Sequence, residues 1–442
     1  MKTNSDEMHN QEMLLKKIRQ SSEVFDKLAN SYEVWVPESG WLAGRRNRDK
    51  NDSKRKYLDD WTMLSFVFEI DNCHYPMADS YLQYGIDGVI RIAAETLETL
   101  QNNLQSKLQD QTQLDIAYLE SLLHVWKRFR QFVADHMVLA LESAKQETSD
   151  TKKKRYEKIA KICQNLTINK PNTFCEALQL FWFTYLFRSP FGAGCIGRLD
   201  QLLYPFYKHD CEMGIWDQQE AEKMLEEMFT RMNEINTGDT LRNLMLSGQD
   251  AKGNDQTNEI TYLILVAYEN TGGSEPHLNV RFHEKTPKKL RDNCINMLSS
   301  GSGQPTIYFD EAVLPAMEKA GICHEDACQY ANDGCTETVI AGKSAIVFWQ
   351  YEMVKTVELT LFGGNENPCV KPVSMKKDSI HGADFVPKTN LLIGIESKKP
   401  QELTTFSEFL SAFFEQMDHQ LDHYFLMIKQ KMQEDQTVSI TS

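Results

Sequence analysis

The sequence predicts a helix-rich α/β protein, and two patterns in different parts of the chain support this fold class. Between residues 88 and 150, apolar side chains such as Val89, Ile92 and Leu97 recur at helical spacing, which predicts long amphipathic helices. After residue 240 the chain changes to short strand-like runs separated by helical stretches, a pattern typical of strands joined by helices. Together the two patterns favour an α/β fold rich in helices.

The first half of the chain is predicted to be helical beyond a polar start. Residues 1–20 are polar, and we expect a flexible N-terminal tail there. The basic run at residues 152–155 has two interpretations, a solvated helix face, which we favour, or a nucleic-acid signal. A further helix is predicted from Glu176, with Asn172 or Thr173 as its N-cap. The apolar run at 177–187 is too short for a membrane span and predicts a buried core helix.

Residues 241–247 and 277–283 are predicted to be strands. In the second strand, alternation places Leu278, Val280 and Phe282 on one face. The opposite face is polar and holds His277, Asn279, Arg281 and His283. This pattern fits an edge strand with one face in water. In a barrel, the same four residues would point into the lumen and would be candidates for substrate binding.

The elements after residue 300 follow from shorter signals. Residues 306–309 are predicted to be a strand, and Asp310 to cap a helix that runs through Met317 and stops at Gly321. Another helix is predicted to open at Glu325, just before the loop at 330–337. Residues 346–362 and a Phe- and Leu-rich segment after residue 400 return to helical spacing.

The composition argues against several classes of partner. The net charge of −15 would repel nucleic-acid backbones and anionic membranes. No stretch approaches the roughly 20 apolar residues of a membrane span, and the polar, acidic start lacks the apolar region of a signal peptide. The ten cysteines show no paired framework, so we expect reduced thiols and a cytoplasmic location.

Four potential metal ligands occur close together in sequence, namely Cys323, His324, Cys328 and Cys335. Their spacing matches no common zinc or iron–sulfur pattern. We therefore favour core cysteines over a metal site and expect no metal.

The segment that contains Cys335 and Glu337 is the main candidate for chemistry. Residues two apart in an extended loop point to the same side, so a thiol and a carboxylate could reach one substrate. Gly334 allows a tight turn there. Asn332 and Asp333 would either contact the substrate or shape the loop, since both residue types favour turns.

Several segments, in the same order along the chain, resemble the glycyl radical enzymes of the pyruvate formate-lyase superfamily. The matching segments are EALQ at 176–179, GRLDQLLYPFY at 197–207, SGQDAKGNDQTNE at 247–259, GQPTIYFD at 303–310 and GCTE at 334–337. The resemblance implies a partial barrel of the family's ten-stranded α/β type, with the cysteine on a loop inside it. It also implies that Cys335 is the thiyl-radical residue and Glu337 the general base.

Two departures from the family pattern shape the expected function. Cys335 has no neighbouring cysteine, so acyl transfer is disfavoured and the resemblance leans toward dehydratases, C–N or C–S lyases and decarboxylases acting on a small polar substrate. No Arg-Val-x-Gly-Tyr glycyl radical segment occurs in the 442 residues. We therefore expect residues 21–442 to form the N-terminal and central part of the family's domain, without the glycyl radical domain.

The resemblance implies partners as well. A radical-SAM activating enzyme, which holds S-adenosylmethionine and a [4Fe-4S] cluster, would generate the glycyl radical, and no cofactor would be bound to this chain itself. A second subunit is expected to supply the radical glycine, and a homodimer is a further option. Two alternatives stay open, a truncated inactive family member and a non-catalytic half-barrel that binds a small molecule.

Overall fold

The structure is a computed structural model that describes residues 4–45, 78–103, 110–188, 194–234, 242–334, 337–344, 353–365, 394–398 and 400–435. The chain divides into two compact units, residues 1–346 and residues 347–442. None of the helices in the described ranges is long and apolar enough to cross a membrane.

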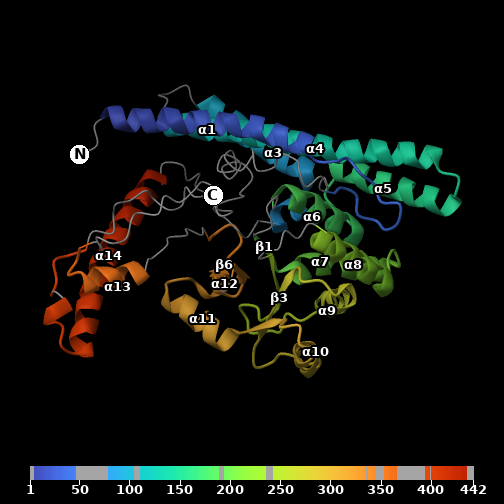
Figure 1. The fold of residues 1–442 in the computed structure, drawn as a ribbon. Helices are drawn as coiled ribbons and strands as arrows, with labels where there is room; N and C mark the ends of the chain where they lie inside the picture. The colour runs from blue at the N-terminus through green and yellow to red at the C-terminus, as the bar shows by residue number, and fades with distance from the viewer. Residues whose placement is uncertain are drawn as a thin grey trace. The chain divides into compact units, whose positions relative to one another are not determined.

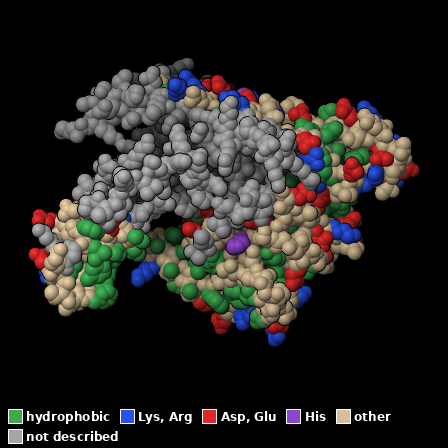
Figure 2. Space-filling model, in the orientation of Figure 1, with side chains coloured by type: hydrophobic (Ala, Val, Ile, Leu, Met, Phe, Trp, Pro, Cys, Tyr) green, Lys and Arg blue, Asp and Glu red, His purple; other side chains and the backbone are tan. Residues whose placement is uncertain are grey.

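Long helices form one part of the first unit (Figure 1). They are α1 (Asn4–Ser31), α3 (Ala78–Asn103), α4 (Asp110–Gln146) and α5 (Asp150–Ile168), and α4 packs against each of the other three. The three lysines of the basic run at 152–155 lie exposed on α5, as expected of a solvated helix face, whereas Arg155 is half-buried and donates to the Glu38 carbonyl. Figure 2 shows acidic and basic side chains interspersed over the described surface of this unit.

The start of the chain differs from the flexible tail that the sequence predicted. Residues 4–20 belong to helix α1, and Ile18 is fully buried against Leu114 and Ala117 of α4. The hydroxyl of Ser121 on α4 also donates to the Ile18 carbonyl at 2.9 Å. These partners lie about 100 residues away in sequence, so local polarity alone could not reveal the packing.

A four-stranded parallel sheet forms the centre of the unit. Its strands are β1 (Gly194–Gly197), β2 (Arg242–Ser247), β3 (His277–Phe282) and β4 (Thr306–Phe309), in that spatial order. The helices α6 (Phe174–Arg188), α7 (Leu199–Met213), α8 (Gln218–Glu234), α9 (Glu259–Thr271) and α10 (Lys288–Ser299) supply side chains to the main core against one face of the sheet. A helix after each strand is what parallel pairing requires. The predicted helix-rich α/β class is confirmed.

Helix α6 is the buried core helix expected from its apolar run. Phe181, Trp182 and Phe183 are almost completely inaccessible to solvent. The helix begins with a reciprocal cap, in which the Thr173 hydroxyl accepts from the Glu176 amide and the Glu176 carboxylate accepts from the Thr173 amide. Of the two predicted N-caps, Thr173 is therefore the one used.

The two faces of the sheet have different partners. Leu244 and Leu246 of β2, together with Leu278 and Val280 of β3, belong to the main core. Met245 instead belongs to a smaller apolar cluster on the opposite face. That cluster includes residues of α11 (Asp310–Lys319), α12 (His324–Ala327), β5 (Ala331–Asp333) and β6 (Glu337–Val339). The predicted alternation along β3 is therefore present, with its polar face toward β5 and β6.

The edge-strand interpretation of residues 277–283 was wrong. Strand β3 lies between β2 and β4, and both Asn279 and Arg281 on its polar face are buried. The physical reason is that α11, α12 and the β5–β6 hairpin cover this face. Buried polar groups must then find partners inside the protein.

The second unit contains the predicted C-terminal helices. These are α13 (Met353–Leu361), the short η2 (Pro400–Glu402) and α14 (Phe406–Asp435). Helices α13 and α14 pack together, and the Thr356 hydroxyl donates to Gln420 at 3.1 Å across their contact. Apolar side chains such as Val354 and Phe406 remain exposed on these helices.

Candidate active site

The candidate base, Glu337, begins strand β6 of the β5–β6 hairpin, and the candidate cysteine, Cys335, belongs to the segment between the two strands of this hairpin. Asp333 and Glu337 are paired across the hairpin, and Gly334, Cys335 and Thr336 connect them. Cys335 and Thr336 lie outside the described residues. Gly334 has φ of +53°, and a Cβ at this position would lie 2.6 Å from Oε2 of Glu337. The Glu337 carboxylate therefore lies directly over Gly334, and a side chain at position 334 would displace this carboxylate.

Three asparagine carboxamides join the base of this loop to the sheet. Nδ2 of Asn243 on β2 donates to the Gly334 carbonyl at 2.8 Å. Its Oδ1 accepts from Nδ2 of Asn279 on β3 and from Nδ2 of Asn332 on β5, each at 3.1 Å. All three side chains are buried. The loop is thus hydrogen-bonded to the Asn243 side chain of β2, which is in turn hydrogen-bonded to Asn279 of the neighbouring strand β3.

A buried ion pair holds the segment that leads into the hairpin. Arg281 donates from Nε and Nη2 to the two carboxylate oxygens of Asp310, at 2.8 and 2.9 Å, and both side chains are fully buried. Nη1 of Arg281 donates to the carbonyls of Cys328 and Tyr330. The Tyr330 hydroxyl donates to Asp310, and the guanidinium also lies over the Tyr330 ring. Burial raises the pKa of Tyr330, so its hydroxyl stays protonated as this donor.

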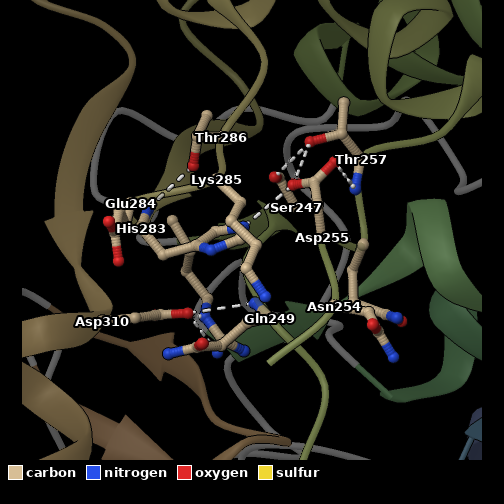
Figure 3. Close-up of polar contacts among 12 residues, drawn as sticks. Ser247, Gln249, Asn254, Asp255, Thr257, His283, Glu284, Lys285, Thr286 and Asp310 are labelled. Carbon is tan, nitrogen blue, oxygen red and sulfur yellow. Dashed lines mark hydrogen bonds and ion pairs between the residues drawn. The ribbon is translucent and has the colours of Figure 1, made fainter. Parts of the chain in front are cut away.

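Asp310 is not the helix cap that the sequence predicted. The N-cap of α11 is Phe309, with no side-chain capping bond. The Asp310 carboxylate accepts from Arg281 and from the Gln249 amide at 3.0 Å instead (Figure 3). A buried guanidinium without a carboxylate partner is strongly destabilising. Pairing with Arg281 therefore outweighs the preference of an aspartate at this position for capping the helix.

Residues of the GRLDQ segment support the same region. Arg198 donates to the carbonyls of Cys328 and Ser247 at 3.2 and 2.9 Å. Asp200 accepts from the Ser247 amide and from the Thr261 hydroxyl, each at 2.8 Å. Burial raises the pKa of Asp200, while Arg198 and these hydrogen bonds act in the opposite direction. Both side chains therefore have structural partners inside the protein.

His283 belongs to a different polar network at the other end of β3 (Figure 3). Its Nε2 lies 2.9 Å from Oδ1 of Asp255, with the side chain almost fully buried. The Thr257 hydroxyl donates to the same Asp255 oxygen and also contacts the Ser247 hydroxyl at 2.8 Å. This network fastens the 250–257 turn to the carboxyl end of the strands.

The predicted substrate residues thus fall into separate groups. Asn279 lies in the asparagine cluster, with Asp333 next to the Gly334 turn and buried. His277 is half-buried at the start of β3, opposite Asn243 in the strand register. Arg281 is engaged with Asp310, and His283 lies in the other network. Substrate contact by any of them remains a prediction.

Sequence reasoning missed Asn243. A partial signal was present, because Asn243 and Ser247 fall on one face of a strand at 241–247 and the apolar Leu244 and Leu246 on the other. The two faces were assigned for the strand at 277–283 but not for the strand at 241–247. The partner of Asn243 is a loop about 90 residues further along the chain, which the pattern could not identify.

The cysteine–histidine segment shows one close pair in the described residues. Nε2 of His324 lies 3.6 Å from Sγ of Cys328, and its Nδ1 lies 2.6 Å from Glu318. The hydrogen bond to Glu318 raises the pKa of His324. Within the ranges that the structure describes, no three His, Cys, Asp or Glu side chains form a metal-binding group.

Comparisons with known proteins agree with this architecture. A sequence profile described as pyruvate formate lyase-like matches residues 71–436. The trans-4-hydroxy-L-proline dehydratase of Clostridioides difficile is 31% identical over 301 residues, which are 64% of this chain and 36% of that protein. The isethionate sulfite-lyase of Oleidesulfovibrio alaskensis is 28% identical over 333 residues, 70% of this chain and 37% of that protein.

The fold agrees as well. The crystal structure of a glycyl radical enzyme from Archaeoglobus fulgidus superposes with a TM-score of 0.72 at 19% identity, covering 93% of this chain and 61% of that one. The chain therefore belongs to the pyruvate formate lyase-like family of glycyl radical enzymes. It spans about a third of the length of the curated relatives it matches.

Proposed function

We propose that this chain provides the cysteine and the base of a glycyl radical lyase or dehydratase that acts on a small polar substrate. The observation that carries the proposal is the position of the Glu337 carboxylate over Gly334, the residue before Cys335. The hairpin is also fixed to the sheet by Asn243 and to the interior by Arg281. Such anchoring is what a site that must hold reacting groups in place requires.

In the proposed reaction, a thiyl radical on Cys335 abstracts a hydrogen atom from a substrate carbon that bears a hydroxyl group. Glu337 takes the hydroxyl proton, which makes loss of a leaving group from the adjacent carbon easier. That group departs with its bonding electron pair. The product radical then recovers a hydrogen atom from the Cys335 thiol, so the thiyl radical on Cys335 is regenerated.

The substrate class follows from this chemistry and from the relatives. The dehydratase and the sulfite-lyase named above act on trans-4-hydroxy-L-proline and isethionate, respectively. Both compounds are small, polar and hydroxylated: the hydroxyl is itself the group that dehydration removes from hydroxyproline, and in isethionate the hydroxyl-bearing carbon lies next to the carbon that holds the sulfonate leaving group. We propose a substrate of the same kind for this chain. Asn279, Asp333 and His277 are the proposed contacts, because they lie nearest the Gly334 end of the sheet.

The radical itself is proposed to come from polypeptide other than residues 1–442, and a second subunit is the proposed carrier. These residues contain no Arg-Val-x-Gly-Tyr segment, so we do not expect the radical glycine among them. A radical-SAM activating enzyme would generate the radical on that partner. We therefore expect no organic radical by electron paramagnetic resonance when this chain alone is treated with an activating enzyme. A glycyl doublet from this chain alone would contradict this part of the proposal.

The experiment is anaerobic turnover by the chain with an activating enzyme and a family polypeptide that carries the glycyl radical segment. Trans-4-hydroxy-L-proline and isethionate are the first probes, with products followed by mass spectrometry. Glu337→Gln is expected to lower kcat by about 10²- to 10⁴-fold, the usual contribution of a general base. Cys211→Ser, at an exposed cysteine outside the site, is the matched control.

Three results would redirect the proposal. Unchanged turnover in Glu337→Gln would remove Glu337 as the base. Binding of a probe by the chain with no turnover in the reconstituted system would favour the non-catalytic binding alternative. Absence of both binding and turnover would favour an inactive family member.

A further inference from the structure

The orientation of the three buried carboxamides in the asparagine cluster is determined by one backbone oxygen. A carbonyl oxygen can only accept, so the Asn243 atom that contacts Gly334 must be Nδ2. Oδ1 of Asn243 then faces Asn279 and Asn332, which must both present Nδ2. The usual ambiguity between amide oxygen and nitrogen is thereby resolved for all three side chains.

This cluster holds the loop at Gly334, a residue that restricts its own backbone conformation only weakly. Gly334 has φ of +53°, a left-handed conformation that glycine leaves as readily as it adopts. The Gly334 carbonyl belongs to the planar peptide that connects it to the next residue. A hydrogen bond to that oxygen therefore fixes the plane from which the loop continues.

We propose that Asn243 is a positioning residue for Cys335, acting through the Gly334 carbonyl. This inference rests on the proposed function, because it assigns Asn243 a role in the reaction at Cys335. Asn279 and Asn332 hold the Asn243 carboxamide in the donating orientation. Without that donor, the Gly334 carbonyl loses its hydrogen bond to β2, and the peptide plane that leads to Cys335 is less restrained.

The surroundings make the bond a strong constraint. Asn243 is 1% exposed and Asn332 is fully buried, so water does not compete freely for these groups. Hydrogen bonds in such an environment are stronger than in water, and an unmatched polar atom is costly. Rotating the Asn243 carboxamide would place Oδ1 against the Gly334 oxygen and Nδ2 against two other donors.

Asn243→Asp tests the inference with almost no change of shape. One carboxylate oxygen still accepts from Asn279 and Asn332, while the other meets the Gly334 carbonyl and repels it. The control is Asn233→Asp, which loses two donated bonds, to the carbonyls of Phe229 at 2.9 Å and Glu275 at 2.7 Å. It keeps the acceptor for the Ser274 and Glu275 amides and lies outside the asparagine cluster.

The first readout needs no radical chemistry. In the isolated chain, Asn243→Asp is expected to speed amide hydrogen exchange in the peptide covering 331–340 by about tenfold or more. It is also expected to change the rate of Cys335 alkylation by iodoacetamide, measured by peptide mass spectrometry. The Asn233→Asp control should change neither. If Asn243→Asp does not fold, as judged by circular dichroism, Asn243→Ala takes its place, because it removes the same donor without adding charge.

The second readout separates positioning from general stability. In the reconstituted system, Asn243→Asp is expected to lower kcat by about 100-fold with KM unchanged, the effect of a misplaced reacting group. Unchanged exchange at 331–340 together with unchanged Cys335 alkylation would overturn the inference, whatever the activity. Turnover by the wild-type chain with an unaltered kcat in the variant would also overturn it. No turnover by the wild-type chain would instead count against the proposed function, and the exchange result would still decide whether Asn243 anchors the loop.

Discussion

The Arg281–Asp310 pair gives the sharpest prediction about what holds the hairpin in place. Both side chains are fully buried, and Asp310 also accepts from Tyr330 and from the Gln249 amide. Replacing Arg281 by Met leaves a buried carboxylate without its cation. Breaking a buried pair in this way costs about 3–5 kcal/mol of unfolding free energy. We expect a loss in that range for Arg281→Met.

A control and a double variant make the test specific. Lys288→Met breaks the exposed pair with Asp292, and such pairs contribute at most about 1 kcal/mol. Combining Arg281→Met with Asp310→Leu removes both buried charges and should recover part of the loss, because no charge is left buried without its partner. The recovery is incomplete because the Tyr330 hydroxyl and the Gln249 amide lose their acceptor.

The assay is urea unfolding followed by tryptophan fluorescence, which reports on the first unit through Trp126, Trp182 and Trp216. A loss below about 1 kcal/mol for Arg281→Met, equal to that of the Lys288→Met control, would refute the reasoning. A double variant no more stable than Arg281→Met would refute the explanation by an unpaired buried charge.

Three further predictions concern stability. Gly248 has φ of +96°, and an added Cβ would lie 2.4 Å from Nε of Arg281, whereas a Cβ on Gly214, with φ of +63°, would have no neighbour within 4 Å. Gly248→Ala should therefore lower the unfolding free energy, measured in urea, by more than the roughly 1–2 kcal/mol of backbone strain expected for Gly214→Ala. Equal losses in the two variants would contradict the close approach of Arg281 to Gly248. Burial lowers the pKa of His136 to about 4, so between about pH 6.5 and 4 the histidine is protonated in the unfolded state but not in the folded state. The unfolding free energy should therefore fall by up to about 3 kcal/mol as pH falls across that window, and His136→Phe should flatten the plot of unfolding free energy against pH. Thr173→Ala removes the cap of α6 and should cost about 1 kcal/mol, a result contradicted by an unchanged urea midpoint.

Much of the fold could be predicted because its signals are local. The strand at 306–309 was predicted with its observed bounds, and β2 (Arg242–Ser247) lies within the strand predicted at 241–247, of which residue 241 is outside the described residues. The capping pattern at Thr173 and the apolar run of α6 depend on neighbours three or four residues away. Such patterns can be detected from sequence without knowledge of the tertiary structure.

The contacts that position the hairpin are non-local, and the sequence did not reveal them. Asp310 has the composition and location of a helix cap, but its partner Arg281 lies 29 residues earlier. Asn243 bonds to Gly334, 91 residues later, and only the docking of β5 against β2 brings them together. A polar residue in a strand shows which face of the sheet its side chain occupies. Its function depends on the elements that cover this face, and these come from distant parts of the chain.

The central claim is that Cys335 is the residue that reacts with the substrate. The most direct test is turnover of trans-4-hydroxy-L-proline and isethionate by Cys335→Ser in the anaerobically reconstituted system, with the organic radical measured by electron paramagnetic resonance in the same samples. The account predicts that the glycyl radical on the partner polypeptide still forms and that product formation is abolished. Product formation at the wild-type rate in Cys335→Ser would contradict it.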